Sequence, residues 1–319
     1  MGAGRAVGLL LGVTADAVVA DPRRGHPVAA FGTLALRAER VLYRDRRAAG
    51  LCYAGALVGG AAAAGAVVER LCRRSPVLET VATAVATWTV LGGASLADEA
   101  EAMARALGDG ELELARGRLG NLCGRAPDDL DERGLARATV ESVAENTSDA
   151  VVAPLLWGAV AGVPGLVAYR AVNTLDAMVG RRSQRYRNFG WAAARLDDAA
   201  NLLPSRACAA LTAACAPVVG GSAERVLRVW RRDASAHPSP NAGPAEAAFA
   251  GALGVRLGGR IVYRHVTEQR PVLGDGRDAD VRDVAPAARL SRVIAASGAL
   301  LAAGAAWCCA AGKRDHASP

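Results

Sequence analysis

Residues 141–206 read ESVAENTSDAVVAPLLWGAVAGVPGLVAYRAVNTLDAMVGRRSQRYRNFGWAAARLDDAANLLPSR. Their middle, Ala150–Tyr169, is 20 residues without a charge, which is long enough for a helix that crosses a membrane. Polar side chains crowd both ends of this segment, whereas an ordinary span is flanked by a few anchoring charges. Because polar groups are costly beside an apolar span, they indicate a functional site at the membrane edge.

The flank before the apolar segment carries an acidic stripe. Glu141, Glu145 and Asp149 are four residues apart, so in a helix they share one face, with Ser142 and Asn146 beside it. Like charges at this spacing repel one another, so a divalent cation or an arginine is expected nearby. A solvated acidic helix face is the alternative, and the spacing alone does not distinguish the two.

The flank after the apolar segment is denser in polar groups. Asn173 and Asp176 are three residues apart, and Gly180 follows. A basic and aromatic run and a helical segment then contribute Arg181, Arg182, Arg185, Tyr186, Arg187, Arg195, Asp197, Asp198, Asn201 and Arg206. A positively charged loop beside a span explains the arginines, but it does not explain the Asp and Asn residues between them.

The composition favours a membrane protein over a nucleic-acid-binding one. Hydrophobic residues make up 52% of the 319-residue chain, and the net charge is +7. A basic chain is generally a candidate for nucleic-acid binding, but here the arginines cluster beside apolar runs. The seven cysteines show neither a CxxC pair nor a Cys/His spacing for zinc, and we interpret them as small buried hydrophobic residues.

Six apolar segments predict an all-α polytopic integral membrane protein with about four to six membrane-embedded helices; they are residues 6–20, 51–68, 80–97, 150–169, 207–223 and 293–312. If all six crossed, the polar loops 21–32 and 233–243 would face away from 170–206. Pro154, Pro164 and Pro217 therefore favour re-entrant or buried segments at 150–169 and 207–223. A site inside a membrane-embedded cavity is the alternative.

The remaining segments predict the domain organisation. We expect residues 1–319 to form a single membrane-embedded helical domain, from which an extramembrane helical arm extends at 98–149. An extramembrane loop region is expected at 224–292, with a rigid Pro-rich loop at 233–243 and an extended loop at 263–278. Residues 313–319 are expected to be a disordered tail.

At this point the motifs resemble a known family. ESVAENTSD, AVNTLDAMVG, RYRNFGWAAARLDDAANLLPSR and HPSPNAG resemble the CobD/CbiB family of adenosylcobinamide-phosphate synthases, from about Asp16 to about Arg292. The family's N-terminal DP…HPV…G signature also resembles residues 21–32, which points to Asp21 and His26. Family members tend to have a glycine where Arg264-His265 stands here, so the local loop geometry is expected to differ.

The resemblance implies an amide-forming ligase of cobalamin biosynthesis. Aminopropanol or its O-phosphate would be joined to a propionate of adenosylcobyric acid, driven by ATP with Mg²⁺. A carboxylate does not condense with an amine unaided, so we expect an acyl phosphate that the amine displaces. The implied partners are the lipid bilayer, these substrates and possible further cobalamin-pathway enzymes, without nucleic acid. The implied location is the inner cell membrane, with the active face towards the cytoplasm.

The resemblance also suggests residue roles. Metal ligands are expected at Glu145, Asp149, Asp176 and Asp198. Catalytic residues are expected at Glu145, Asp149, Asp176, His26 and His237, either histidine being the candidate base. Substrate or ATP contacts are expected at Asp21, Glu141, Asn146, Asn173, Arg185, Tyr186, Arg195, Asp197, Asn201, Arg206, Ser239 and Asn241.

Two other functions fit parts of the sequence. A corrinoid-binding or corrinoid-transporting membrane protein would also place polar groups beside its spans, but it would leave the corrinoid chemically unchanged. A lysine Schiff-base enzyme is disfavoured because the only lysine, Lys313, lies in the tail.

Overall fold

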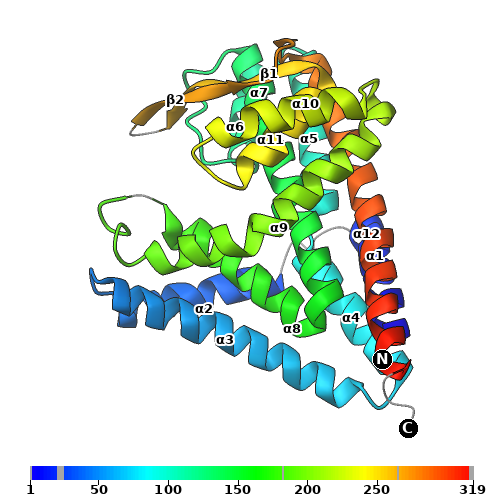
Figure 1. The fold of residues 1–319 in the computed structure, drawn as a ribbon. Helices are drawn as coiled ribbons and strands as arrows, with labels where there is room; N and C mark the ends of the chain where they lie inside the picture. The colour runs from blue at the N-terminus through cyan, green and yellow to red at the C-terminus, as the bar shows by residue number, and fades with distance from the viewer. Residues whose placement is uncertain (1, 20–24, 182, 264–265, 316–319) are drawn as a thin grey trace. The chain divides into compact units, whose positions relative to one another are not determined.

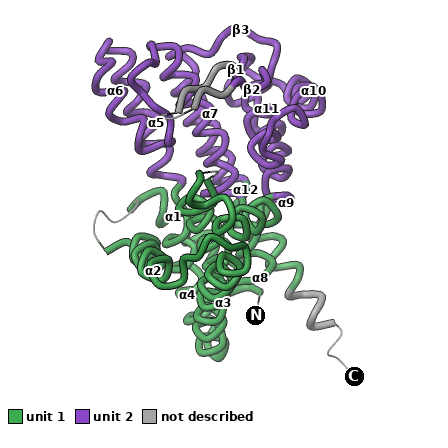
Figure 2. The backbone as a smooth tube through the Cα atoms, turned by 90° about the vertical axis from the view of Figure 1, so that its left-hand side faces the viewer, with its two compact units in different colours: residues 1–92, 153–201, 298–319 green, residues 93–152, 202–297 purple. Residues whose placement is uncertain are grey.

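A computed structural model describes residues 2–19, 25–181, 183–263 and 266–315 (Figure 1). The chain divides into two compact units (Figure 2): unit 1 comprises residues 1–92, 153–201 and 298–319, and unit 2 comprises 93–152 and 202–297. Within the described residues, six helical stretches are long and apolar enough to cross a membrane: Gly2–Val19, Arg47–Cys72, Pro76–Gly108, Glu132–Gly180, Trp191–Val219 and Val281–Cys309. The prediction of an all-α, multi-pass membrane protein is therefore confirmed.

Unit 1 is helical throughout its described part. It contains α1 (Gly2–Val19), α2 (Pro27–Leu42), α3 (Arg47–Cys72), α4 (Pro76–Val90), α8 (Ala153–Leu175), η2 (Asp176–Gly180), the first part of α9 (Trp191–Cys215) and the last part of α12 (Val284–Asp315). Both α2 and α4 begin with a capping side chain followed by proline. The Oγ atom of Ser75 accepts a hydrogen bond from the Leu78 N–H at the start of α4, which satisfies a backbone donor that the helix leaves open.

A glycine stripe brings α1 against α4. Gly4, Gly8 and Gly12 are four residues apart on α1, and they face Glu79, Thr83 and Thr87 on α4. A Cβ atom at Gly8 would lie 2.5 Å from the Thr83 Cβ, so only glycine permits this approach. Small residues at this spacing are the usual means by which helices pack closely in a membrane.

Helix α8 is broken in its middle. Gly162 has a φ of 67°, Pro164 follows inside the helix, and the two arms pack tightly near the break. A Cβ atom at Gly165 would lie 2.3 Å from the carbonyl oxygen of Trp157, and one at Gly158 would lie 2.8 Å from Leu166. The segment predicted to be re-entrant or buried is thus two short helices rather than one straight span. Residues 207–223 likewise form no helix of their own, because they contain the end of α9 and the 3₁₀ turn η3 (Ala216–Val219).

Charged side chains satisfy the backbone groups that the break exposes. The Val163 N–H donates a 3.1 Å hydrogen bond to Glu69 Oε2, and Arg5 Nη1 donates a 3.4 Å bond to the Ala159 carbonyl. Arg5 also pairs with Glu69 at 3.4 Å. Non-helical backbone at membrane depth persists only where the protein supplies such partners. Residues from α1, α3 and α8 therefore meet at one buried carboxylate.

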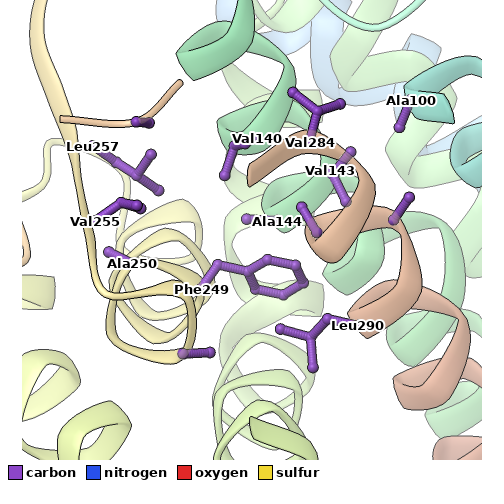
Figure 3. Packing of buried hydrophobic residues seen from close by; sticks show 14 of the residues in the cluster. Ala100, Val140, Val143, Ala144, Phe249, Ala250, Val255, Leu257, Val284 and Leu290 are labelled. Atoms are coloured by element: carbon purple, nitrogen blue, oxygen red, sulfur yellow. The ribbon is translucent and has the colours of Figure 1, made fainter. Parts of the chain in front are cut away.

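Unit 2 packs helices around an apolar core. It contains α5 (Gly93–Gly108), α6 (Leu112–Leu119), α7 (Glu132–Thr147), η1 (Ser148–Val152), η3, α10 (Ala223–Asp233), η4 (Ala234–Ala236), α11 (Ala242–Leu253) and η5 (Val281–Asp283). It also includes the last part of α9 and the first part of α12. Phe249 of α11 is fully buried and lies among Val140, Val143 and Leu290 (Figure 3). Most of the predicted helical arm, residues 98–149, is part of this core.

Unit 2 also contains a small three-stranded β-sheet. Strand β1 (Val255–Tyr263) pairs antiparallel with β2 (Val266–Leu273) and parallel with β3 (Arg277–Asp278). The register shifts at a bulge between Leu257 and Gly259, where Gly258 has a φ of +86°. The 224–292 region is thus built from helices and strands where the sequence predicts loops. The predicted tail begins inside α12, and residues 316–319 lie outside the described residues.

We expect Glu69→Ala to destabilise the protein strongly. Its removal leaves the Val163 N–H and Arg5 without this carboxylate, and breaking a buried ion pair costs about 3–5 kcal/mol. The matched control is Arg73→Ala, because Arg73 pairs with the same carboxylate at 2.9 Å but is 49% exposed, and its loss should cost about 1 kcal/mol or less. Unfolding in detergent, followed by circular dichroism, measures both; equal losses would contradict this role for Glu69.

Candidate functional site

A buried ion pair joins three segments of unit 2. Glu141 of α7 is 1% exposed and forms an ion pair with Arg125, which lies in the loop before α7. The other carboxylate oxygen accepts a 2.6 Å hydrogen bond from the Gly258 N–H in the β-bulge, and Arg137 approaches it to 4.0 Å. Glu141 therefore anchors a loop and a strand to α7, and its contact with substrate stays a prediction.

A second buried carboxylate lies in the same region. Glu246 of α11 is 1% exposed, and its Oε1 lies 3.7 Å from His237 Nε2 and 4.0 Å from Arg270 Nη1. That oxygen accepts no hydrogen bond from any described residue. Arg270 Nη1 also lies 3.3 Å from His237 Nε2. A carboxylate, an imidazole and a guanidinium thus share one space with little access to water.

Burial moves two of these groups towards their neutral forms. It raises the pKa of Glu246 well above its ordinary range, and the negative charges of Glu141 and Glu145 raise it further. Burial also lowers the pKa of His237, and the nearby Arg270 charge acts in the same direction. Because the charged form of each group loses solvation, burial favours the protonated form of Glu246 and the neutral form of His237.

The HPSPNAG loop holds His237 in place. The ring Nδ1 accepts a 3.0 Å hydrogen bond from the Ser239 N–H, while Nε2 faces Glu246 and Arg270. Ser239 Oγ accepts hydrogen bonds from the Asn241 and Ala242 N–H groups, at 3.3 and 3.1 Å, at the start of α11. Both ring nitrogens therefore have neighbours inside the protein, and the role of His237 as base stays a prediction.

Arg206 and Asn241 hold the same loop against α9. Arg206 donates to the Pro240 carbonyl at 3.3 Å, and Ser205 donates to Asn241 Oδ1 at 3.4 Å. A cavity of about 480 Å³ opens beside the loop, with Arg206, Trp230 and His237 among its lining residues.

The carboxylates of the acidic stripe lie in different environments. Glu145, one turn after the buried Glu141, is exposed and interacts electrostatically with Arg270 and Arg125. Asp149 lies in the π-helical turn η1 and is half-buried. Asn146 donates a 2.9 Å hydrogen bond to the Ser142 carbonyl of its own helix. Among the predicted catalytic residues of unit 2, Glu145 is the one that the structure leaves exposed.

In unit 1, the predicted asparagines pair within the helix bundle. Asn173 Nδ2 and Asn201 Nδ2 both donate to Asp197, at 3.4 and 3.0 Å. Tyr169 donates to Asn201 Oδ1 at 2.8 Å. This chain of hydrogen bonds joins α8 to α9, so these residues satisfy one another where the sequence predicts contacts with substrate.

The loop before α9 is fixed to α2 by a buried carboxylate. Arg185 Nη2 donates to Glu39 at 2.9 Å, and the Tyr186 hydroxyl donates to the same oxygen at 3.0 Å. Burial raises the pKa of Tyr186, so its hydroxyl stays protonated as this bond requires. Arg185 is therefore engaged with Glu39, whereas we predicted it as a phosphate contact.

Other predicted residues of unit 1 lie around this loop. Arg195 and Asp198 form an ion pair at 3.6 Å and line a cavity of about 630 Å³. Asp176, in the π-helical turn η2, packs so tightly that a Cβ atom at Gly180 would lie 1.8 Å from its Oδ1. His26 caps α2 through a 3.1 Å hydrogen bond from the Val28 N–H, and Asp21 lies outside the described residues.

The described residues do not form a complete metal-binding site. No group of three or more His, Cys, Asp or Glu side chains in this part of the chain is placed to hold an ion. The four predicted ligands divide between the units, with Glu145 and Asp149 in unit 2 and Asp176 and Asp198 in unit 1. Mg²⁺ often binds through one or two carboxylates together with substrate phosphates. We therefore assign no reaction step to a metal held by the protein alone.

Sequence reasoning overlooked Glu246, Arg125 and Arg270. Glu246 did carry a signal, because it is the only charged residue in the otherwise apolar helix Ala242–Leu253. A lone carboxylate on a helix that is buried on all sides requires a partner. Arg125 and Arg270 carried no such signal, because a loop and a strand give no spacing that relates them to Glu141 or Glu246.

We expect Glu141→Ala and Glu145→Ala to differ in stability. The first leaves the buried Arg125 charge without its carboxylate and should cost about 3–5 kcal/mol. The second removes an exposed side chain of the same helix and should change the free energy of unfolding by about 0.5 kcal/mol or less. Chemical denaturation in detergent compares the two, and a large loss for Glu145→Ala would show that its carboxylate is structural.

Glu246 should also give the stability a pH dependence. Its pKa in the folded protein lies above the ordinary value of 4.5, so the folded state retains a proton that the unfolded chain releases. This term lowers stability as the pH rises from about 4.5 towards the raised pKa. Glu246→Gln removes this loss of stability. The lowered pKa of His237 has the opposite effect, because it raises stability as the pH rises to about 6.5, and the substitution leaves that contribution in place.

The stability of the variant relative to wild type should therefore increase as the pH rises from about 4.5 towards the raised pKa of Glu246. Unfolding midpoints recorded across this range measure the difference. A constant difference would show that Glu246 is ionised in the folded protein.

Comparison with known proteins places the chain in a family. The model of the CobD/Cbib protein family matches residues 9–291. A protein of Mycobacterium tuberculosis named "Cobalamin biosynthesis protein CobD" is 56% identical over 93% of this chain and 95% of its own length. A protein of the same name from Chromobacterium violaceum is 44% identical over 86% of this chain and 88% of its own. No solved structure matches. The chain belongs to the CobD/CbiB family.

Proposed function

We propose that this protein is an amide-forming ligase of cobalamin biosynthesis. It joins (R)-1-amino-2-propanol, or the O-phosphate of this amine, to a propionate carboxylate of adenosylcobyric acid. Membership of the CobD/CbiB family and relatives named as cobalamin biosynthesis proteins support the pathway. The motifs ESVAENTSD and HPSPNAG, which carry the resemblance, both contribute to the polar region of unit 2.

One observation supports amide formation in particular. Glu145 is an exposed residue that interacts electrostatically with Arg125 and Arg270, and these arginines pair with the buried Glu141 and Glu246, respectively. Fixed guanidinium groups stabilise negative charge on a carboxylate or phosphate substrate. An open carboxylate can bind an ammonium group and accept its proton. These are the two demands of amide formation from an acid and an amine.

The proposed chemistry has two steps. A propionate oxygen attacks the γ-phosphorus of ATP, which releases ADP and forms an acyl phosphate. The amine nitrogen then attacks the acyl carbon, the C–O bond to phosphate breaks, and inorganic phosphate leaves. Glu145 takes the proton that the ammonium group must lose before it attacks. Mg²⁺ enters as the ion of Mg-ATP and offsets the charge of its phosphates.

The membrane location follows from the same proposal. The described residues contain six helical stretches suited to crossing a membrane, so the chain is a multi-pass membrane protein. ATP and the corrinoid are supplied in the cytoplasm, and arginines concentrate in the loops that carry the motifs. We therefore propose the inner cell membrane, with the catalytic loops on the cytoplasmic side.

We expect the purified protein to convert adenosylcobyric acid in the presence of Mg-ATP and one of the two amines. Mass spectrometry of the corrinoid should show a gain of one amine less one water, with release of one ADP for each amide formed. Testing the two amines separately identifies the substrate. Glu145→Gln should abolish this turnover because the amide cannot accept the proton.

The matched control is Glu132→Gln, which removes an exposed carboxylate at the start of the same helix and should leave turnover unchanged. Asp149→Ala and Asp176→Ala test the two carboxylates in the π-helical turns, and they should also abolish turnover without loss of folding. A corrinoid of unchanged mass with folded wild-type protein would reject the ligase and favour binding or transport.

A further inference from the structure

The cavity of about 630 Å³ in unit 1 is rich in arginine; we call it the arginine pocket. It is lined by the loop between η2 and α9 and by the first turns of α9, through Gly180, Arg181, Ser183, Gln184, Tyr186, Arg187, Trp191, Ala194, Arg195 and Asp198. Its volume lies within the range of about 300–1,000 Å³ typical of small-molecule sites. Its loop lies between the candidate spans Glu132–Gly180 and Trp191–Val219.

The pocket carries positive charge that no described carboxylate neutralises. Among the described residues that line the pocket, Asp198 is the only acidic one, and it pairs with Arg195 at 3.6 Å. Arg181 and Arg187 are exposed, and among the described residues no carboxylate forms an ion pair with either. Two exposed arginines, for which no ion pair with a described carboxylate is found, therefore line this cavity.

The walls of the pocket are held in place independently of any ligand. The buried Glu39 accepts hydrogen bonds from Arg185 and Tyr186, which fixes the loop to α2. A Cβ atom at Gly190 would lie 1.8 Å from the Val179 carbonyl oxygen, so the end of the loop packs directly on η2. The 25-residue helix α9 begins at Trp191, which lines the pocket, and its N-terminal dipole favours an anion.

We propose that the arginine pocket binds the phosphate groups of a ligand, with Arg181 and Arg187 as the principal contacts. Arginine is the side chain best suited to phosphate, because its planar fork donates two parallel hydrogen bonds. The inference rests on the proposed function in taking ATP as the first ligand to test. The chain has no GxxxxGK[ST] loop for ATP phosphates, so a ligase of this kind needs another phosphate site.

The phosphate can come from ATP, from aminopropanol O-phosphate or from an anionic lipid headgroup, and binding measurements distinguish these sources. The protein in nanodiscs of neutral lipid is titrated with ATP and with aminopropanol O-phosphate by calorimetry, without the corrinoid. Arg181→Ala/Arg187→Ala should weaken binding at least about tenfold. The matched control is Arg37→Ala/Arg40→Ala, which removes two exposed charges from α2 of the same unit and should leave affinity unchanged.

A second pair of variants keeps the test valid if the alanine protein fails to fold. Arg181→Lys/Arg187→Lys retains the charge but loses the two-pronged geometry, so affinity should fall by less than in Arg181→Gln/Arg187→Gln. If neither soluble phosphate binds, nanodiscs containing phosphatidylglycerol test the lipid source, and retention of that lipid by wild type but not by the Gln variant supports the pocket. Equal binding of every phosphate ligand by wild type and Gln variant overturns the proposal.

The binding readout separates this inference from the proposed ligase. Phosphate binding that depends on Arg181 and Arg187, without amide formation, would leave the pocket in place and reject the reaction. Amide formation with unchanged kinetics and unchanged ATP affinity in the Gln variant would support the reaction and reject the pocket.

Discussion

A carboxylate removed from water must be paired and hydrogen-bonded, because its lost solvation costs several kcal/mol. In each unit, a buried glutamate meets this constraint and joins segments that are far apart in the sequence. Glu69 binds Arg5 and the Val163 N–H in unit 1, and Glu141 binds Arg125 and the Gly258 N–H in unit 2. In both cases the partners include a backbone donor that irregular structure leaves without a helical or sheet partner. Local irregularity and buried charge therefore stabilise each other.

Some charged side chains are held by buried carboxylates, whereas their exposed neighbours are available to a ligand. Glu39 holds Arg185, and the neighbouring Arg181 and Arg187 line the arginine pocket. Glu141 likewise holds Arg125 beside the exposed Glu145. The buried member of each pair fixes the geometry, and the exposed neighbour can meet a substrate. Preorganisation of this kind lowers the reorganisation that a charged reaction would otherwise require.

The sequence predicted the features that depend on local pattern. Apolar runs predicted the membrane helices. Pro154 and Pro164 favoured a re-entrant or buried segment at 150–169, and the structure breaks this segment at Gly162; its path relative to the membrane stays a prediction. The sequence did not predict the two units or the sheet, because these depend on packing between distant segments. Among the site residues, Arg195 and Asp198 do line a cavity. Arg185 and His237 face internal partners that motif spacing cannot reveal.

The acidic stripe shows why spacing alone was insufficient. Four-residue intervals place Glu141, Glu145 and Asp149 on one face only if the helix is regular, but the π-helical turn η1 begins at Ser148 and shifts the register. A second π-helical turn, η2, contains Asp176, so the continuous stretch Glu132–Gly180 deviates from α-helical geometry before, within and after α8. Such turns cost backbone energy and are frequent at functional sites. Asp149 and Asp176 lie in these two turns, so the irregular backbone, and not a regular four-residue spacing, sets the direction in which their carboxylates leave the helix.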